Sequence, residues 1–134
     1  IANKPFTIVG DGSQTRDFTY VSDIIRALIT VAKKKCKKKV YNVGSGKTVS
    51  VNRIVELLKG EKVFIPKRPS EPDTTFADIS LIKKEIGWSP KIDIKQGLKK
   101  ILNDIQYWKN APVWTPLSIK KETKDWFKYL KKKT

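Results

Sequence analysis

The chain has 134 residues, of which 39% are hydrophobic and 31% are charged, a composition typical of a globular domain exposed to water. It has no histidine and a single cysteine, Cys36, which excludes Cys/His zinc sites, an internal disulfide and Ser-His-Asp or Cys-His nucleophiles in this chain. It also lacks methionine and any apolar run near the ~20 residues that cross a bilayer. We therefore expect a fragment of a longer cytoplasmic protein, with no membrane contact.

The formal net charge of +16 raises the question of a nucleic-acid partner. Base-reading sites favour arginine, whose planar fork pairs with guanine. Only four of the 29 basic residues are arginines, and lysines form runs at 33–35, 37–39 and 131–133. We interpret the lysine runs as solvated surface, with a polyanion site as the alternative, and expect no specific nucleic-acid partner. The four arginines are Arg16, Arg26, Arg53 and Arg68.

The N-terminal half predicts short strands that alternate with helices. Three runs of β-branched and aromatic residues predict strands, over residues 6–9, 40–43 and 62–65. Between them, apolar residues recur at helical spacing after Ser22 and after Ser50, which we expect to be the N-caps of two helices. Gly60 is expected to end the second helix. This order of elements indicates an α/β fold.

The C-terminal half predicts helices only. It begins with a polar loop over residues 66–73 that contains three prolines. Helices are then expected to begin at Asp78, at Asp93 or a neighbour, and at Ser118, and Gly87 is expected to end the first of them. The last helix is expected to carry one apolar stripe, formed by Ile119, Thr123, Trp126, Phe127 and Leu130. Because three strands are too few for a doubly wound sheet, we expect the main sheet to lie outside this chain.

The segment Gly44-Ser45-Gly46-Lys47-Thr48 ends like a phosphate-binding Walker loop. That loop requires another glycine five positions before Gly46, where this chain has Tyr41. Its helix also begins directly after Lys-Thr, whereas Val49 precedes the expected cap at Ser50. The pattern therefore favours a tight turn between a strand and a helix over a nucleotide-triphosphate site.

Arg16 follows the glycine turn at residues 10–12, whose backbone amides we expect to be exposed. A planar guanidinium beside such a turn suits a bidentate contact with phosphate. The alternative is a salt bridge with Asp11 or Asp23, and the spacing alone leaves both interpretations open.

Arg68 and Glu71 lie in the proline-containing loop over residues 66–73. Prolines stiffen the loop and so reduce the entropy cost of holding a ligand. The Glu71 carboxylate is able to accept both hydroxyls of a ribose, and its alternative is an exposed loop acid. These two residues are candidates for a binding site.

Four motifs occur in order: GDGSQTRDFTYVSDIIRAL (10–28), YNVGSGKTVSVNRIVELL (41–58), RPSEPDTTFADISLIKKEIGW (68–88) and IDIKQGL (92–98). Over about residues 5 to 105 this series resembles the C-terminal half of the NAD-dependent nucleotide-sugar epimerase/dehydratase family, the extended short-chain dehydrogenases. The stretch YWKNAPVWTPLSIKKETKDWFKYL (107–130) is similar to the tail of one bacterial branch of that family. UDP-glucose 4-epimerase-like enzymes of polysaccharide biosynthesis are members.

The resemblance implies a substrate-binding lobe, with short strands and helices, over residues 1–110 and a helical extension over 111–134. It implies that Arg16 contacts the diphosphate of a nucleotide-sugar and that Arg68 closes on it from the other side. Glu71 matches the acid on the ribose. Other substrate-binding positions match the strand along the base and the wall of the same pocket: Thr7, Ile8, Val9 and Thr75.

The chain departs from the family in its catalytic and cofactor motifs. Gly10-Asp11-Gly12 continues to Thr15, not to the third glycine of G-x-G-x-x-G. The family's Tyr-x-x-x-Lys pair is matched only by Tyr129 and Lys133, in a lysine-rich tail. We therefore expect NAD to be bound by a missing N-terminal Rossmann domain, and this chain alone to be inactive.

Two interpretations of the whole chain stay open. One is the substrate-binding part of an enzyme that takes a nucleotide-sugar. The other is a truncated, non-catalytic binding or assembly module with a basic face. In either case we expect a homodimer or association with another chain.

Overall fold

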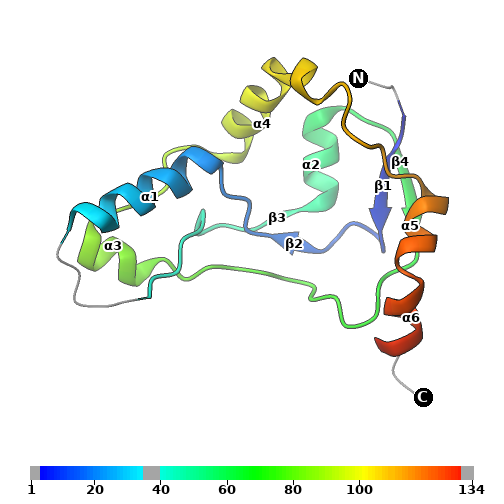
Figure 1. Cartoon of the computed structure of the whole chain (residues 1–134), viewed down its shortest axis with the longest axis horizontal. Coiled ribbons are helices and arrows are strands. Elements are labelled where there is room, and N and C mark those ends of the chain that lie inside the picture. Colours follow the sequence, from blue (N-terminus) through cyan, green and yellow to red (C-terminus); the bar gives the residue numbers. More distant parts are fainter. Residues whose placement is uncertain (1–3, 35–39, 131–134) are drawn as a thin grey trace. The chain divides into compact units, whose positions relative to one another are not determined.

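The computed structural model describes residues 4–34 and 40–130 and shows a mixed α/β chain, as the sequence predicts (Figure 1). Cys36 and the lysine runs at 37–39 and 131–133 lie outside the described residues, as does Lys35 of the first run. The elements, in order, are β1 (Phe6–Val9), β2 (Thr15–Arg16), α1 (Val21–Lys33), β3 (Val49–Ser50), α2 (Val51–Leu58), β4 (Lys62–Ile65), α3 (Ser80–Ile86), α4 (Ile94–Asn103), the 3₁₀ helix η1 (Ile105–Trp108), α5 (Pro116–Glu122) and α6 (Lys124–Leu130).

The chain forms two compact units. The first, here called the sheet unit, comprises Ile1–Gln14, Ser50–Asp73 and Asp104–Thr134. The second, the helix unit, comprises Thr15–Val49 and Thr74–Asn103. The short strands β2 and β3 pair with each other.

In the sheet unit, β1 and β4 pair in parallel, in a register from Phe6↔Lys62 to Val9↔Ile65. The strands predicted over 6–9 and 62–65 are therefore confirmed. Ile8 is buried, with 1% of its surface exposed, and so is Val55 of α2, with 3% exposed. These two side chains form the core of this unit.

Helix α2 begins as predicted, because the Ser50 hydroxyl accepts a hydrogen bond from the Arg53 N–H at 3.1 Å. Its last residue is Leu58, and the C-cap is Lys59, which has a left-handed φ of 54°, so the helix ends one residue before the predicted Gly60. A Cβ at Gly60 would clash with the ring of Phe6, so this glycine allows the close approach to β1 without a shift of that side chain.

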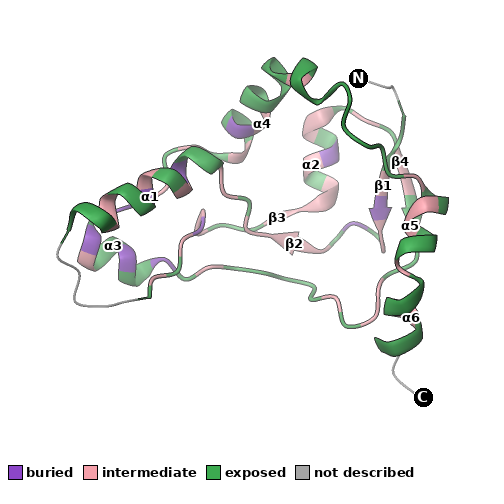
Figure 2. Cartoon of the chain, viewed as in Figure 1, coloured by how far each residue is buried: buried purple, intermediate pink, exposed green. Residues whose placement is uncertain are grey.

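In the helix unit, α1 and α3 pack together through one hydrophobic cluster (Figure 2). The side chain of Lys34 extends from the end of α1 to the Ile86 carbonyl at 2.6 Å and closes the same pair of helices. As predicted, α3 ends at Gly87, whose φ is 71°. The prediction that Asp78 is the cap of α3 is off by one residue, because Ile79 occupies the N-cap position; the Asp78 carboxylate still accepts a hydrogen bond from the Ser80 N–H at 2.9 Å. The buried members of the cluster are Ala27, Ile79, Ile82, Ile86 and Trp88.

Helix α1 begins one residue before the predicted N-cap. Tyr20 occupies the N-cap position without a side-chain hydrogen bond, and Ser22 lies inside the helix. Asp23 stabilises this end instead, since it is 2% exposed and accepts hydrogen bonds from the backbone N–H groups of Lys91 and Ile92 at 2.9 Å each. The prediction for Ser22 is wrong because a long-range contact, not a local cap, holds this helix end.

The prediction of a strand over residues 40–43 is also wrong. Within the described ranges, no neighbouring strand pairs with this segment. Its side chains are nevertheless used, because Tyr41 and Val43 pack on the α1–α3 cluster and the Tyr41 hydroxyl donates to Glu85 at 2.8 Å. A β-prone run becomes a strand only where another strand accepts its backbone hydrogen bonds.

The C-terminal part contains two short helices in place of the single predicted one. Thr115, not Ser118, is the cap of α5, and Ser118 completes a reciprocal capping box with it. The helix breaks at Thr123, and α6 follows. The helix expected from Asp93 begins at Ile94, where the Asp93 carboxylate accepts the Gln96 N–H at 2.8 Å.

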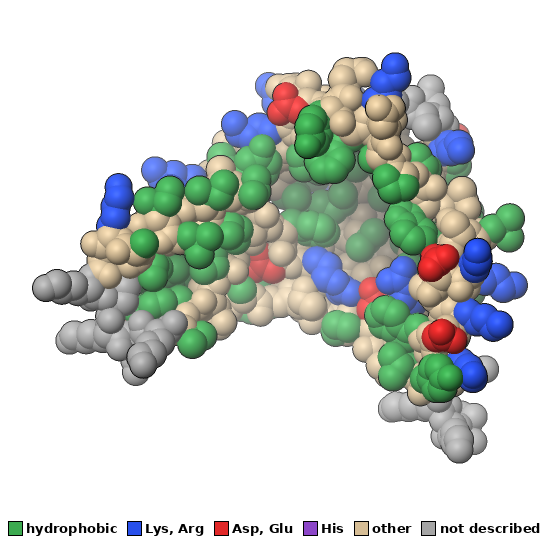
Figure 3. Space-filling model, in the orientation of Figure 1, with side chains coloured by type: hydrophobic (Ala, Val, Ile, Leu, Met, Phe, Trp, Pro, Cys, Tyr) green, Lys and Arg blue, Asp and Glu red, His purple; other side chains and the backbone are tan. Residues whose placement is uncertain are grey.

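The outer face of α1 is apolar and exposed. Hydrophobic side chains lie on the surface along this helix (Figure 3). The largest exposed fractions belong to Leu28, at 65%, and Val21, at 62%, and Ile25 and Ile29 are each 50% exposed.

Candidate functional site

A small pocket lies at the carboxyl ends of β1 and β4 in the sheet unit. Because the two strands are parallel, the loops that follow them, over residues 10–14 and 66–73, meet at the same edge. Ligands of parallel α/β sheets bind at this edge. The pocket is lined by Val9, Gly10, Asp11, Ser13, Gln14, Lys67, Glu71, Pro72 and Asp73.

The glycine loop over residues 10–14 is held by α2. Asn52 donates from its side-chain amide to the Asp11 carbonyl at 2.8 Å and from its backbone N–H to the Gly12 carbonyl at 3.0 Å. Gly12 has a φ of 76°, and a Cβ there would lie 2.5 Å from Asn52 Oδ1, so glycine is required. The Gly10 N–H donates to the Ile65 carbonyl at 2.8 Å. This one amide of the turn serves the sheet and is not available to a ligand.

Opposite charges line the pocket. Two hydrogen bonds from Ser13, donated by its hydroxyl and its backbone N–H, hold the pKa of Asp11 below its ordinary value. The ion pair with Asp73 raises the pKa of Lys67. Both groups are therefore ionised at neutral pH, so charges of both signs line the pocket.

Arg68 lies beside this pocket, on the same loop. The loop turns through Ser70, which has a positive φ of 60°, and the Glu71 N–H is directed at the Arg68 carbonyl at 3.4 Å. Arg68 is half-buried, and its guanidinium carbon lies 5.4 Å from the ring centre of Trp126. Its Nε atom is buried and has no hydrogen-bond acceptor among the residues that the structure describes.

Arg16 lies in the helix unit, on β2. Its Nη1 donates to the Thr15 carbonyl at 2.8 Å. The same carbonyl accepts the Thr75 N–H at 3.2 Å, so the structure brings the predicted residues Arg16 and Thr75 together. The alternative partner Asp23 is held by Arg26 at 2.6 Å and by two backbone amides, which makes it a poor candidate for pairing with Arg16.

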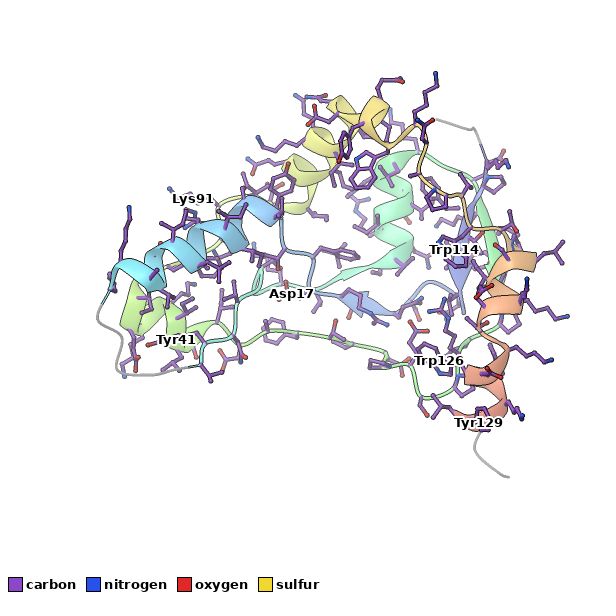
Figure 4. The ribbon with its side chains drawn as sticks, viewed as in Figure 1. Asp17, Tyr41, Lys91, Trp114, Trp126 and Tyr129 are labelled. Carbon is purple, nitrogen blue, oxygen red and sulfur yellow. The ribbon has the colours of Figure 1, made fainter. Side chains whose placement is uncertain are left out.

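Asp17, which follows Arg16, organises this part of the helix unit (Figure 4). Its carboxylate accepts backbone N–H bonds from Ser45 at 2.6 Å, Gly46 at 3.2 Å and Ala77 at 3.3 Å. Burial alone would raise the pKa of Asp17, but these bonds hold it below its ordinary value. Asp17 was not among the predicted site residues, although it belongs to the Arg-Asp-aromatic triplet that follows the glycine loop.

The contacts of Asp17 also bear on the segment over residues 44–48. Two backbone amides of this segment point to a carboxylate of the chain itself, where a Walker loop would direct them to phosphate. A Cβ at Gly44 would lie 2.7 Å from Asp17 Oδ2, so this glycine serves the close approach of the turn. The segment is a structural turn, as the sequence favours.

The seven predicted substrate-binding residues divide between the two units. Thr7, Ile8, Val9, Arg68 and Glu71 lie in the sheet unit, and Arg16 and Thr75 lie in the helix unit. Val9 and Glu71 line the pocket, whereas the Ile8 side chain is buried in the core, so only its backbone is able to face a ligand.

Sequence reasoning missed Lys67 and Trp126. Lys67 adjoins Arg68 in the same loop, and Trp126 was assigned to an apolar helical stripe.

Within residues 4–34 and 40–130, no group of three or more His, Cys, Asp or Glu residues is arranged to hold a metal ion. The helices that the structure describes are all too short or too polar to span a lipid bilayer.

The GDP-mannose 4,6 dehydratase family matches residues 1–101 of the chain. The chain belongs to this family of NAD-dependent nucleotide-sugar epimerases and dehydratases. The expected resemblance is thereby confirmed. The UDP-glucuronate 4-epimerase of Thermodesulfobacterium geofontis is 39% identical over 107 residues, which cover 75% of this chain and 33% of that protein. The chain thus spans about a third of the length of such relatives.

Solved structures show the same similarity. The UDP-glucuronic acid 4-epimerase of Bacillus cereus, in complex with UDP-glucuronic acid and NAD, superimposes with a TM-score of 0.73 at 34% identity, over 78% of this chain and 36% of that one. The UDP-glucose 4-epimerase of Thermotoga maritima, solved with UDP-glucose, has a TM-score of 0.73 at 30% identity, over 81% of this chain and 37% of that one.

Proposed function

We propose that this chain is the C-terminal, substrate-binding part of an NAD-dependent nucleotide-sugar epimerase or dehydratase. The observation that carries the proposal is the pocket at the carboxyl ends of β1 and β4, lined by Lys67 and Glu71 and adjoined by Arg68. Support comes from relatives solved with UDP-sugars, which this chain matches over about a third of their length.

Each candidate residue takes one part of the nucleotide-sugar. Arg68 and Arg16 contact the diphosphate, since a guanidinium fork suits phosphate oxygens. The Glu71 carboxylate accepts the ribose hydroxyls. We assign residues 7–9 to the base, with Ile8 contributing backbone only, and Thr75 to the wall of the nucleotide site. By holding the nucleotide, these residues position the sugar for reaction.

The residues of this chain do not fit NAD. The Gly10 amide is bonded to the Ile65 carbonyl, and the glycine loop lacks the third glycine of the dinucleotide-binding turn. We assign NAD, and the oxidoreduction that it supports, to the remaining two-thirds of a full-length enzyme. Whether the reaction is an epimerisation, a dehydration or a decarboxylation is set there.

UDP titration tests this function. The wild-type chain should bind UDP, and Arg16→Lys and Arg68→Lys should each weaken binding by about 10- to 100-fold, because lysine keeps the charge and loses the bidentate contact. Arg53→Lys is the matched control, since Arg53 is paired with Glu56 on the exposed face of α2. The wild-type chain should give no product when it is incubated with NAD and UDP-glucuronic acid.

Calorimetric titration and melting curves on the same four proteins separate the alternatives. If the two arginines only brace their loops, the variants will melt at lower temperature with unchanged UDP affinity. Equal affinity in all four proteins, or turnover by the chain alone, contradicts the proposed function.

A further inference from the structure

The last helix of the chain contacts the loop that carries Arg68. Trp126 of α6 donates from its indole nitrogen to the Pro69 carbonyl at 2.7 Å. Figure 4 shows the Trp126 side chain directed from α6 toward the loop after β4. The family match ends at residue 101, so this contact is made by a segment outside it.

Trp126 also supports the Arg68 side chain itself. The Arg68 guanidinium carbon lies over the Trp126 ring at 5.4 Å from its centre, a distance typical of a cation–π contact. One aromatic side chain therefore holds both the backbone of the loop, through Pro69, and the cationic group next to it.

The type of side chain that contacts Arg68 decides whether its N–H donors remain available to a ligand. A carboxylate beside Arg68 would occupy its N–H donors and neutralise its charge, whereas an aromatic face attracts the cation and leaves the in-plane donors available. The Arg68 Nε is buried and has no acceptor in the described part of the chain, so the structure shows no carboxylate that occupies this donor.

Trp126 is itself held in place by the extension. The Phe127 N–H donates to the Thr123 carbonyl at 3.2 Å, which connects α6 to the end of α5, and the capping box at Thr115 fixes the start of α5. The exposed fraction of Trp126 is 37%, against 57% for Trp114 in the same extension. Trp126 contacts the loop and Trp114 is more exposed, so Trp114 serves as the control for Trp126.

We propose that Trp126 is a positioning residue for the diphosphate of the nucleotide-sugar, acting through Arg68. The inference rests on the proposed function, since Arg68 must contact phosphate for its orientation to matter. It assigns to the C-terminal extension a part of the substrate site that the family match does not cover.

The test compares UDP, which has the diphosphate, with uridine, which lacks it. Trp126→Ala should weaken UDP binding by about 5- to 30-fold, the range of one cation–π contact, and leave uridine affinity unchanged. Trp126→Phe keeps an aromatic face and should recover part of the loss. Trp114→Ala should bind UDP like the wild type.

A double-mutant cycle separates positioning from general destabilisation. In the Arg68→Ala background, Trp126→Ala should cause no further loss of UDP affinity, because the residue through which it acts is gone. Melting curves identify any variant that fails to fold, and Trp126→Phe then supplies the comparison.

The outcomes separate a failure of this inference from a failure of the proposed function on which it rests. If Arg68→Ala weakens UDP binding and Trp126→Ala does not, the role of Trp126 is wrong and the proposed function stands. An equal loss of UDP and uridine affinity, or additive losses in the cycle, also overturns it. If the wild type does not bind UDP, both proposals fall.

Discussion

Asp23 is a buried carboxylate whose charge is held by one donor on its own helix and by two backbone donors far away in the sequence. Arg26 and the backbone amides of Lys91 and Ile92 all donate to it. Burial alone would raise the pKa of Asp23, but the hydrogen bonds, with the charge of Arg26, hold it below its ordinary value. Arg26 continues to the Ser89 carbonyl at 2.6 Å and lies over Trp88 at 5.4 Å, so Asp23 organises one end of the helix unit.

A lowered pKa in the folded state makes Asp23 stabilising above the pKa of the unfolded chain, and this contribution is lost as the pH falls through the folded pKa. Asp23→Asn should lower the free energy of unfolding at neutral pH by about 1–3 kcal/mol, because backbone donors lose a charged acceptor. It should also flatten the loss of stability below about pH 4.

Urea unfolding at several pH values measures both effects. Asp104→Asn is the control, since Asp104 is exposed and makes no side-chain cap at η1. A variant that is as stable as the wild type at neutral pH would show that the Asp23 bonds contribute little.

At the scale of the helix, α1 and α2 begin in different ways. Helix α2 has a local cap, the Ser50 hydroxyl, whereas the N-cap residue of α1, Tyr20, makes no side-chain cap and this helix relies on Asp23. A side-chain cap satisfies an N–H group that the first helical turn leaves unpaired. The same residue type therefore has different roles at Ser50 and Ser22.

Ser50→Ala should lower the free energy of unfolding by about 0.5–2 kcal/mol, the ordinary contribution of an N-cap. Ser22→Ala should change it by less than about 0.5 kcal/mol, because Ser22 is an exposed residue inside α1. Thermal melting of the two variants against the wild type measures the difference. If Ser22→Ala were the more damaging change, the assignment of the α1 cap would be incorrect.

At the scale of the whole molecule, the exposed apolar face of α1 is a surface that we expect another chain to cover. Four large apolar residues on one helix, each at least half exposed, form a patch of the kind that marks association in soluble proteins. We expect this face to be covered in solution by a second copy of the chain or by another chain.

Sedimentation at two protein concentrations tests this expectation. The wild type should associate more at the higher concentration, and the double variant Ile25→Lys with Leu28→Lys should stay monomeric, because charge on the patch opposes burial. Leu117→Lys, at an 81% exposed position on α5, is the control and should associate like the wild type. A wild type that is monomeric at both concentrations contradicts the prediction.

Local signals in the sequence were sufficient for much of the fold. The strands at 6–9 and 62–65, the cap at Ser50 and the left-handed Gly87 each depend on residues within one turn or strand, and each was predicted. The loop with Arg68 and Glu71 was found for the same reason, because its prolines and its place after a strand are visible in the sequence. The family, too, was identified from motifs that the chain itself contains.

Contacts between distant residues were decided only by the tertiary structure. The segment over 40–43 has the composition of a strand but finds no strand partner in the described ranges, since pairing depends on what lies beside it. Asp17 reaches amides 28 and 60 residues away, and Trp126 reaches a carbonyl 57 residues away. Periodicity placed Trp126 on an apolar stripe. Which group it meets there is set by packing, because hydrophobic spacing specifies a face of a helix and not its partner.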